Sequence, residues 1–465
     1  MLSDWQEYKF ENLLSEPVRN GIYKKKEFHG RGARIVNMGE LFGHSRLYDV
    51  EMKRVELFDR EQPKVLLQRG DLLFARRSLT AEGAGKCSII KEVLEPTTFE
   101  SSIIRARPNS QLANPDFLYY LFSSPYGKYL LGTIRRQVAV AGITGTDLKE
   151  LKLKVPPLPA QKAIAHILGS LDDKIELNRK MNETLEAMAK ALFKSWFVDF
   201  DPVIDNAILA GNPLPAELRE KLEVRKLKLE EKYGSLAAAR QTLANSNFPA
   251  EFIETEELGL IPKGWGVGPL GNFITVKRGG SPRPIHDFLV SKGLPWVKIS
   301  DATGSNNRFI SETKQYIKPE GLKKTVLLKK GSLILSNSAT PGLPKFLNID
   351  ACIHDGWLHF PTIAHFSSIY LYQLFLILRK ELILQGNGSV FTNLKTDILR
   401  NQVVLVPTAK TIQQFDKIVN IIFDRMNSLN SEQRYLSKLR DTLLPKLLSG
   451  ELRRKDAEKL VEKIV

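Results

Sequence analysis

The stretch Val155–Phe197, VPPLPAQKAIAHILGSLDDKIELNRKMNETLEAMAKALFKSWF, decides the fold. A second stretch with the same plan, VPTAKTIQQFDKIVNIIFDRMNSLNSEQRYLSKLRDTLLPKLL, runs from Val406 to Leu448. Both begin with Val-Pro, and each position of the second lies 251 residues after its counterpart in the first. A chain that repeats itself at a constant offset can fold with an internal two-fold axis, and it then presents two similar but non-identical surfaces to one long ligand.

Apolar residues recur in steps of four and three along both stretches, which predicts two long helices that pair as a coiled coil. The equivalent polar residues Asn182 and Gln433 would weaken this seam and set its register. A two-fold axis would make the pair antiparallel. The alternative is two amphipathic helices that each pack on their own domain. The predicted seam consists of Ile164, Leu168, Leu171, Ile175, Asn182, Leu185, Leu192, Phe415, Val419, Ile422, Met426, Gln433, Leu436 and Leu443.

The repeat continues upstream of both helices. Gly70 matches Gly331, and the strand-like Arg34–Met38 matches Pro295–Ile299. We therefore predict an α+β protein in which two mixed α/β domains, in pseudo-two-fold arrangement, are separated by two long antiparallel coiled-coil helices. The expected parts are a first mixed domain (1–155), a central long helix (156–200), a connector with a charged helix (201–263), a second mixed domain (264–406), a distal long helix (407–452) and a charged tail (453–465).

The composition favours an acidic partner. The chain of 465 residues carries a formal net charge of +16 with a pI near 9.5, and nucleic acid is the usual partner of such a protein, although a basic protein without a polyanion is the alternative. Two cysteines are too few for a disulfide scaffold. No signal peptide begins the sequence, and the longest apolar run, 369–378, is too short to span a bilayer. We expect a cytoplasmic protein.

Basic side chains in loops are the candidate DNA contacts. Lysine mainly neutralises phosphates, whereas arginine, asparagine and glutamine can also pair with base edges. The favoured candidates, Arg76-Arg77 and Arg135-Arg136, follow a predicted strand and a predicted helix, which would hold them rigidly. The alternative for each residue is a solvated charge. The full set is Lys24, Lys25, Lys26, Arg31, Arg34, Arg76, Arg77, Arg135, Arg136, Gln137, Lys277, Arg278, Arg283, Lys345, Asn387 and Ser389.

The residues that catalysis would need are absent from the sequence. Pro156-Pro157 follows Val155 rather than the Asn or Asp of an adenine methyltransferase motif, and no Gly-x-x-x-x-Gly-Lys-Ser/Thr phosphate loop occurs. His354 and His359 are close in sequence, but no cysteine or carboxylate cluster completes a metal site. We expect a non-catalytic chain without a metal or cofactor of its own.

Three segments together carry a family resemblance. They are Pro156–Gln161 leading into the helix that ends at Leu192–Pro202, the entry Gly259–Trp265, and the end Leu439–Leu452. In this order they resemble the specificity subunit of a type I DNA restriction-modification enzyme. Gly70–Arg76 resembles the glycine-acid-strand motif of that family's target-recognition domains. Ser332 stands where the second copy would have the acid, so that carboxylate is not required in both domains.

The resemblance implies that each variable domain reads one half of a bipartite, asymmetric site in double-stranded DNA. The paired helices would set the spacer and dock methyltransferase subunits, two of them by expectation, and restriction or translocase subunits would join the complex. S-adenosylmethionine, ATP and Mg would belong to those partners. Two alternatives are a coiled-coil scaffold that binds nucleic acid without sequence preference, and the specificity region of a fused methyltransferase or nuclease.

Overall fold

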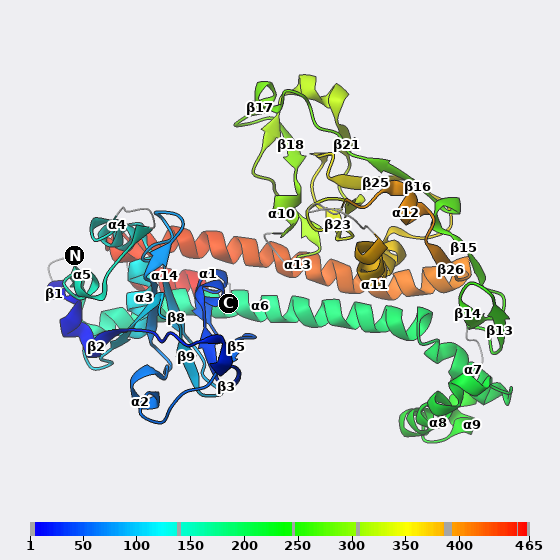
Figure 1. Ribbon diagram of the computed structural model, residues 1–465, viewed down its shortest axis with the longest axis horizontal. Coiled ribbons are helices and arrows are strands. Elements are labelled where there is room, and N and C mark those ends of the chain that lie inside the picture. The colour runs from blue at the N-terminus through cyan, green and yellow to red at the C-terminus, as the bar shows by residue number, and fades with distance from the viewer. Residues whose placement is uncertain are drawn as a thin grey trace. The chain divides into compact units, whose positions relative to one another are not determined.

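The computed structural model describes residues 5–136, 141–243, 247–303, 307–385, 393–452 and 454–462. The chain divides into two compact units (Figure 1). Unit 1 combines Met1–Lys180 with Asn430–Val465, and unit 2 is Met181–Leu429. The long helices α6 (Leu158–Phe197) and α13 (Ala409–Leu448) each contribute one part to each unit. No helix among the described residues combines the length and apolarity needed to cross a membrane.

Unit 1 is built on a five-stranded sheet in the order β2-β10-β6-β8-β4. Its strands are β2 (Leu14–Asn20), β10 (Ile103–Pro108), β6 (Leu72–Ala75), β8 (Cys87–Ile90) and β4 (Arg46–Leu47). A three-stranded sheet has the order β5 (Lys53–Val55), β3 (His29–Val36), β9 (Thr97–Phe99). Two further pairs are β1 (Gln6–Lys9) with β12 (Lys152–Val155), and β7 (Arg77–Ser78) with β11 (Ala141–Gly142). The helices are α1 (Met38–Gly43), α2 (Gln62–Val65), α3 (Pro115–Ser123), α4 (Pro125–Thr133), α5 (Gly145–Lys149) and α14 (Arg454–Glu462).

Unit 2 has a five-stranded sheet in the order β16-β25-β22-β23-β19, formed by Ile274–Arg278, Trp357–Ile363, Leu333–Ser336, Pro344–Leu347 and Phe309–Ile310. The other large sheet has the order β17-β20-β18-β24-β21, formed by Leu289–Val290, Tyr316–Ile317, Leu294–Val297, Ala351–Ile353 and Val326–Leu328. Smaller pairs are β15 (Gly266–Pro269) with β26 (Val403–Val406), and β13 (Phe252–Thr255) with β14 (Gly259–Pro262). The helices are α7 (Asp201–Ala210), α8 (Arg219–Tyr233), α9 (Leu236–Leu243), α10 (Ile299–Thr303), α11 (Ser368–Gln385) and α12 (Thr396–Arg400).

The two five-stranded sheets have the same topology. In both, the central strand pairs antiparallel with its two neighbours, and a short parallel strand forms one edge. The register also agrees, because Leu72 pairs with Ile89 as Leu333 pairs with Phe346. Gly70 and Gly331 precede these strands with φ of 93° and 90°, a left-handed conformation that favours glycine. The predicted fold of two mixed domains joined to long helices is confirmed.

Within each unit, α6 and α13 run antiparallel. In unit 1, Arg440 contacts Asp172 and Gln433 contacts Ile175. The residue numbers of the partners in α13 therefore decrease as those in α6 increase. In unit 2 the same order relates the pairs Met181 with Arg425 and Phe193 with Phe415. Every residue of the predicted seam is buried or half-buried. Gln433 donates across the pair to the Ile175 carbonyl at 3.1 Å, so its amide bonds to the partner helix.

A short apolar helix connects each sheet to the helix pair. Helix α3 begins at Pro115 because the Asn114 side chain accepts a hydrogen bond from the Phe117 amide, and six consecutive residues from Phe117 to Phe122 are buried. They share one core with Leu168 and Leu171 of α6 and with Leu436 and Leu443 of α13. In unit 2, α11 takes the same place, with Ser367 as its cap and Tyr370 and Phe375 in a core with Phe193 and Phe415. The charged tail also packs, since Ala457 and Val461 of α14 belong to the core of unit 1.

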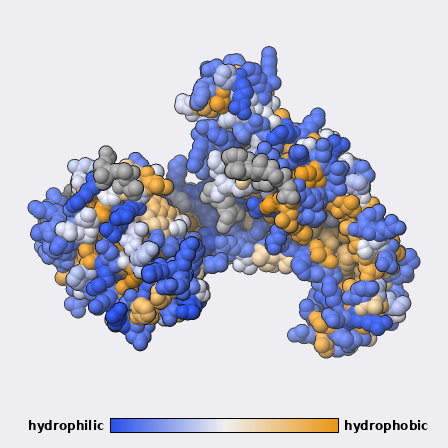
Figure 2. Space-filling view, viewed as in Figure 1, coloured by the Kyte–Doolittle hydropathy of each residue, from blue (hydrophilic) through white to orange (hydrophobic). Residues whose placement is uncertain are grey.

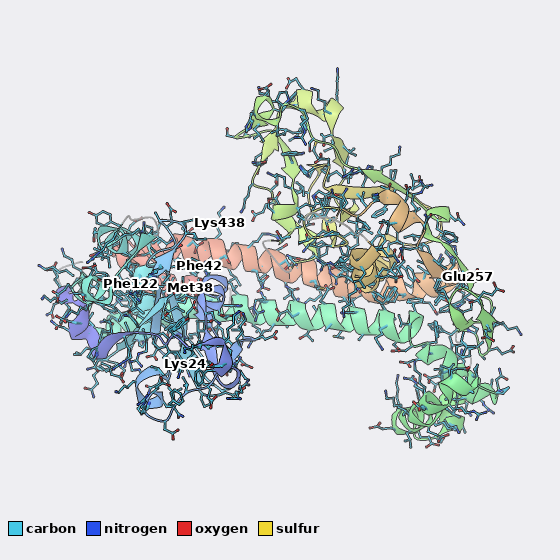
Figure 3. The ribbon with its side chains drawn as sticks, viewed as in Figure 1. Lys24, Met38, Phe42, Phe122, Glu257 and Lys438 are labelled. Carbon is cyan, nitrogen blue, oxygen red and sulfur yellow. The ribbon has the colours of Figure 1, made fainter. Side chains whose placement is uncertain are left out.

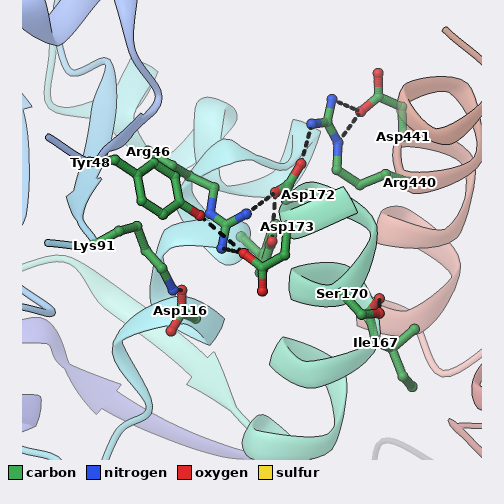
Figure 4. Close-up of polar contacts among 11 residues, drawn as sticks. Arg46, Tyr48, Lys91, Asp116, Ile167, Ser170, Asp172, Asp173, Arg440 and Asp441 are labelled. Atoms are coloured by element: carbon green, nitrogen blue, oxygen red, sulfur yellow. Dashed lines mark hydrogen bonds and ion pairs between the residues drawn. The ribbon is translucent and has the colours of Figure 1, made fainter. Parts of the chain in front are cut away.

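Buried polar side chains attach the sheet of unit 1 to its helix pair (Figure 4). The Asp172 carboxylate of α6 accepts hydrogen bonds from Tyr120 of α3 and Arg440 of α13, both at 2.6 Å, and lies 3.8 Å from Arg46 of β4. Arg46 also pairs with the neighbouring Asp173 at 2.8 Å. One carboxylate therefore links three elements, and we call this set the Asp172 cluster.

Unit 2 has a buried arginine in a similar place. Arg308, immediately before β19, donates to Glu186 of α6 with Nε at 2.8 Å. Its guanidinium lies 3.4 Å from the ring centroid of Phe423 in α13 and 4.7 Å from that of Tyr372 in α11. We call this set the Arg308 cluster. The two units thus attach a mixed domain to the helices through buried arginines but with different partners.

Gly21 shows a close approach that both units share. It follows β2, and a Cβ placed on it would overlap the carbonyl oxygens of Phe99 and Glu100; Gly279 after β16 meets Ile353 and His354 in the same way. Gly21→Ala should lower the free energy of unfolding by about 2–3 kcal/mol, because backbone atoms cannot move aside as a side chain can. Urea unfolding should show this loss, whereas Gly39→Ala, with open space around it, should show none. Equal stability of the two variants would contradict the close approach.

Candidate nucleic-acid interface

In unit 1, the structure brings the two favoured arginine pairs together. Arg76 and Arg77 follow the central strand β6, and Arg135 and Arg136 follow α4. Arg77 pairs with Gly142, and Gly142 exchanges backbone hydrogen bonds with Arg136. The Arg76 carbonyl accepts from the Ile143 amide at 3.0 Å, and the Arg76 amide donates to Ser102 at 2.8 Å. Backbone bonds therefore fix both pairs on one loop cluster.

Their side chains differ in freedom. Arg77 is exposed and makes no ion pair with the described residues, whereas Arg76 is half-buried and donates to the Ser101 carbonyl at 3.3 Å. Arg136 is exposed and paired with Asp147 at 2.8 Å, which orients its guanidinium without covering it. Arg135 is half-buried, with its Nε lacking a hydrogen-bond partner among the described residues. Arg76 also lines a polar cavity of about 790 Å³ with Glu16, Thr144 and Lys149.

The other candidates in unit 1 divide into surface and structural groups. Lys25 and Lys26 are exposed, and Arg31 is exposed beside Glu56. Lys24 (labelled in Figure 3) is only 7% exposed; it pairs with Glu61 at 2.6 Å and lies 4.0 Å from the Phe58 ring centroid. The hydrogen bond from Lys24 lowers the pKa of Glu61. Arg34 is likewise held by Asp49 and the Val50 carbonyl, so Lys24 and Arg34 serve the fold.

In unit 2, the loop cluster at the same end of the sheet has other side chains. Lys277 and Arg278 are exposed at the end of β16, and Arg283 is exposed 3.4 Å from Asp355. Lys345, by contrast, is buried and donates to the Asn307 carbonyl, and burial lowers its pKa to about 8. Lys345 is therefore a core residue rather than a surface cation. Gln137, Asn387 and Ser389 lie outside the described residues.

The sequence analysis did not select Ser281 or Asp355 of unit 2, and it weighed His354 only as a metal ligand. The Asp355 carboxylate accepts from Ser281 at 2.9 Å and lies 2.9 Å from Nε2 of His354. Burial alone would raise the pKa of Asp355, but the Ser281 hydrogen bond and the nearby His354 and Arg283 lower it. The His354 ring lies 5.3 Å from that of Trp296, and burial lowers its pKa. Their distance in sequence, 74 residues between Ser281 and Asp355, left no local signal.

Equivalent backbone positions carry unlike residues in the two units. The Asn337 carbonyl after β22 accepts from the Leu394 amide at 2.7 Å, as the Arg76 carbonyl accepts from Ile143 after β6. Arg76-Arg77 in unit 1 thus corresponds to Asn337-Ser338 in unit 2. Asn337 is fully buried, and its Oδ1 lacks a hydrogen-bond partner in the described part of the chain. One framework therefore presents two different chemical surfaces.

The acid of the Gly70-Asp71 motif has a structural role. The Asp71 side chain is fully buried; it pairs with Arg107 at 2.7 Å and accepts from the Gln68 amide at 2.8 Å. Arg107 also pairs with Glu16, which binds the fully buried Arg105 as well. By strand register, His359 and Pro361 replace Arg105 and Arg107 in unit 2. The loss of the partner arginine explains why Ser332 can replace the acid there.

Nothing in the described residues indicates a metal centre. No group of three or more His, Cys, Asp or Glu side chains gathers there in a way that could hold an ion. The visible face of the molecule is mainly hydrophilic, with apolar patches between (Figure 2). Exposed cations stand at the loop clusters of both units, and such side chains suit contacts with phosphates and base edges: Arg77 and Arg136 in unit 1, and Lys277, Arg278 and Arg283 in unit 2.

The comparisons with known proteins point to a protein that recognises DNA. Residues 3–187 and 262–439 match the family described as the type I restriction modification DNA specificity domain. Because the match covers most of the chain and occurs once in each half, the chain belongs to this family of specificity subunits.

Particular relatives cover nearly the whole chain. The HindI specificity subunit of Haemophilus influenzae is 28% identical over 490 residues, covering 97% of this chain and 100% of that protein. The MjaIX specificity subunit of Methanocaldococcus jannaschii is 26% identical, covering 73% of this chain and 69% of that protein. A solved S subunit from M. genitalium superimposes with a TM-score of 0.52 at 15% identity, covering 95% of this chain and 96% of that one, so it shares the fold.

Proposed function

We propose that this chain is the DNA-recognition subunit of a type I restriction-modification complex, in which each unit reads one half of a bipartite, asymmetric site. The single observation that carries this is the pair of matched sheets with unlike loops. Two copies of one framework suit two half-sites, and the exposed Arg77 of unit 1, where unit 2 has the uncharged Ser338 at the equivalent position, suits two different sequences. The net charge of +16 supplies attraction to the DNA backbone.

The chain acts without chemistry of its own in this proposal. Methyltransferase subunits, two by expectation, would bring S-adenosylmethionine, and restriction subunits would bring ATP and Mg. Exposed apolar side chains on the long helices support a docking role, because between 43% and 72% of each remains open to solvent: Leu177 and Tyr435 in unit 1, and Met188, Ile418 and Ile421 in unit 2. Burial of these side chains against a partner subunit would contribute favourably to docking.

A binding selection tests the proposal. The chain, co-expressed with its methyltransferase partner, is incubated with random duplexes, and the bound fraction is sequenced. We expect enrichment of two short half-sites at fixed separation. Binding without enrichment of any sequence, with random DNA competing equally, would favour a non-specific scaffold. Binding of S-adenosylmethionine by the isolated chain would instead favour a fused enzyme.

The helix pair predicts how the spacer responds to length. Four residues inserted between Lys180 and Met181, with four between Leu429 and Asn430, add one turn to both helices at the boundary of the units. The added rise is about 6 Å at roughly 1.5 Å per residue, or one to two base pairs at about 3.4 Å each. Methylation mapping should show the same half-sites with a spacer longer by one or two base pairs. An unchanged spacer in an active complex would contradict the proposal that the helix pair sets the spacer length.

A further inference from the structure

Leu79 is 97% exposed, the largest fraction among the large apolar residues that the structure describes. It stands in the loop after β7, two residues beyond the exposed Arg77. A side chain so exposed adds almost nothing to the stability of the fold. Single exposed leucines are ordinary on protein surfaces, so its setting must decide whether it has a role.

The loop around Leu79 is braced. Ser78 pairs with Ala141, and its hydroxyl accepts from the Thr80 amide at 3.2 Å. The Gly83 amide donates to Thr80, and a Cβ on Gly83 would overlap the Ser78 hydroxyl and approach Phe42 (labelled in Figure 3). The loop therefore closes tightly beneath Leu79 and holds it outward, so that little ordering entropy remains to be lost on binding.

Cations lie in and beside the loop that carries this apolar tip. Arg76, Arg77 and Lys86 belong to the same loop, and β11 brings Arg135 and Arg136 beside it. Arg77 and Arg136 are exposed, whereas the other three are half-buried and Lys86 donates to the Phe42 carbonyl. The nearby acids are Glu82 in the loop and Asp147, which pairs with Arg136. An apolar tip beside the exposed Arg77 and Arg136 suits a polyanion with an apolar interior, and the stacked bases of duplex DNA provide that.

The equivalent loop of unit 2 lacks this combination. Residues 337–342 read Asn-Ser-Ala-Thr-Pro-Gly, with no cation and no large exposed apolar side chain. Its exposed residue is Ala339, at a φ of 59°. The feature is therefore confined to the half-site that unit 1 reads.

We propose that Leu79 enters the base stack of that half-site as an apolar wedge, while Arg77 and its neighbours hold the flanking phosphates. This rests on the proposed DNA-recognition function. Leucine inserted between base pairs unstacks one step, and the insertion is least costly at pyrimidine–purine steps. The half-site of unit 1 should therefore contain a TA or CA/TG step at which Leu79 inserts.

The test uses the complex of the full chain with its methyltransferase partner. Its selected duplex carries a fluorescent adenine analogue, whose emission rises on unstacking, at successive positions of the half-site. Besides the adenine that the methyltransferase extracts, wild type should show one further step whose emission rises. Leu79→Ala should abolish that further rise and lower specific affinity about tenfold or more, since the leucine is no longer buried. Affinity for random DNA and the salt dependence should stay unchanged.

Two control variants separate the wedge from other causes. Leu94→Ala makes the same chemical change at a leucine that is 65% exposed but stands between Glu92 and Glu95, and it should change nothing. Arg77→Ala should weaken binding to the selected duplex and to random DNA alike. It should also reduce the slope of log affinity against log salt by about one.

Two outcomes would overturn the wedge: Leu79→Ala binds the selected duplex as tightly as wild type, or every rise in emission persists in that variant. A persistent rise belongs to the adenine that the methyltransferase extracts. Failure of the proposed function looks different, because wild type itself would then not prefer the selected duplex over random DNA.

Discussion

Replacing Asp172 with alanine should lower the free energy of unfolding of unit 1 by about 3–5 kcal/mol. The carboxylate is 5% exposed and accepts from Arg440 and Tyr120, with Arg46 nearby. Its removal leaves the Arg440 guanidinium and the Tyr120 hydroxyl without this acceptor and takes a nearby counter-charge from the buried Arg46. In the wild-type protein burial, followed by the Asp172 charge, raises the pKa of Tyr120 well above its usual range, which keeps that hydroxyl as a donor to Asp172.

The neighbouring acid provides the matched control. Asp173 pairs with the same Arg46 but is 64% exposed, so Asp173→Ala should cost about 1 kcal/mol or less. Urea unfolding of both variants, read beside limited proteolysis of unit 1, gives the comparison. Similar losses for the two would show that Asp172 does not hold the sheet to the helices.

In unit 2, Arg308→Ala should cost about 3 kcal/mol or more. Arg308 is fully buried, pairs with Glu186 and covers the ring face of Phe423 at 3.4 Å. Truncation therefore removes a cation–π contact, opens a cavity and leaves the Glu186 carboxylate without this cation. The weakened attachment should also lower the fraction of DNA sites methylated by the assembled complex.

Two further variants define the cause. Arg283→Ala, at an exposed arginine of the same unit, should change stability by less than about 0.5 kcal/mol. The double variant Arg308→Met with Glu186→Leu replaces the ion pair with apolar groups and should recover most of the loss. If the double variant is as unstable as Arg308→Ala, the ion pair is not what stabilises this attachment.

The sequence predicted the fold well where structure is periodic. The constant offset of 251 residues and the spacing of Leu168, Leu171 and Leu436 predicted paired helices, because a seam must repeat at the pitch of the helix. The positions of Arg76-Arg77 and Arg135-Arg136 at element ends were also readable. Their pairing through the backbone, across about 60 residues of sequence, could not be predicted, since no local pattern encodes it.

Buried charges were the main surprise. Lys24 and Lys345 look like surface cations in sequence, yet Glu61 and the Asn307 carbonyl engage them inside the fold. Asp172-Asp173 looks like an exposed acidic turn of a helix, yet one carboxylate is buried and the other is not. Their partners lie 37 to 268 residues away, so only the folded chain reveals which charge is paired.

Genome-wide mapping of adenine methylation in cells that express this chain with its methyltransferase partner tests the central claim most directly. The account predicts one split motif, with two short and unlike half-sites separated by a fixed run of unread bases. A single continuous motif, or methylation without a motif by a complex that binds DNA, would contradict the assignment of one half-site to each unit.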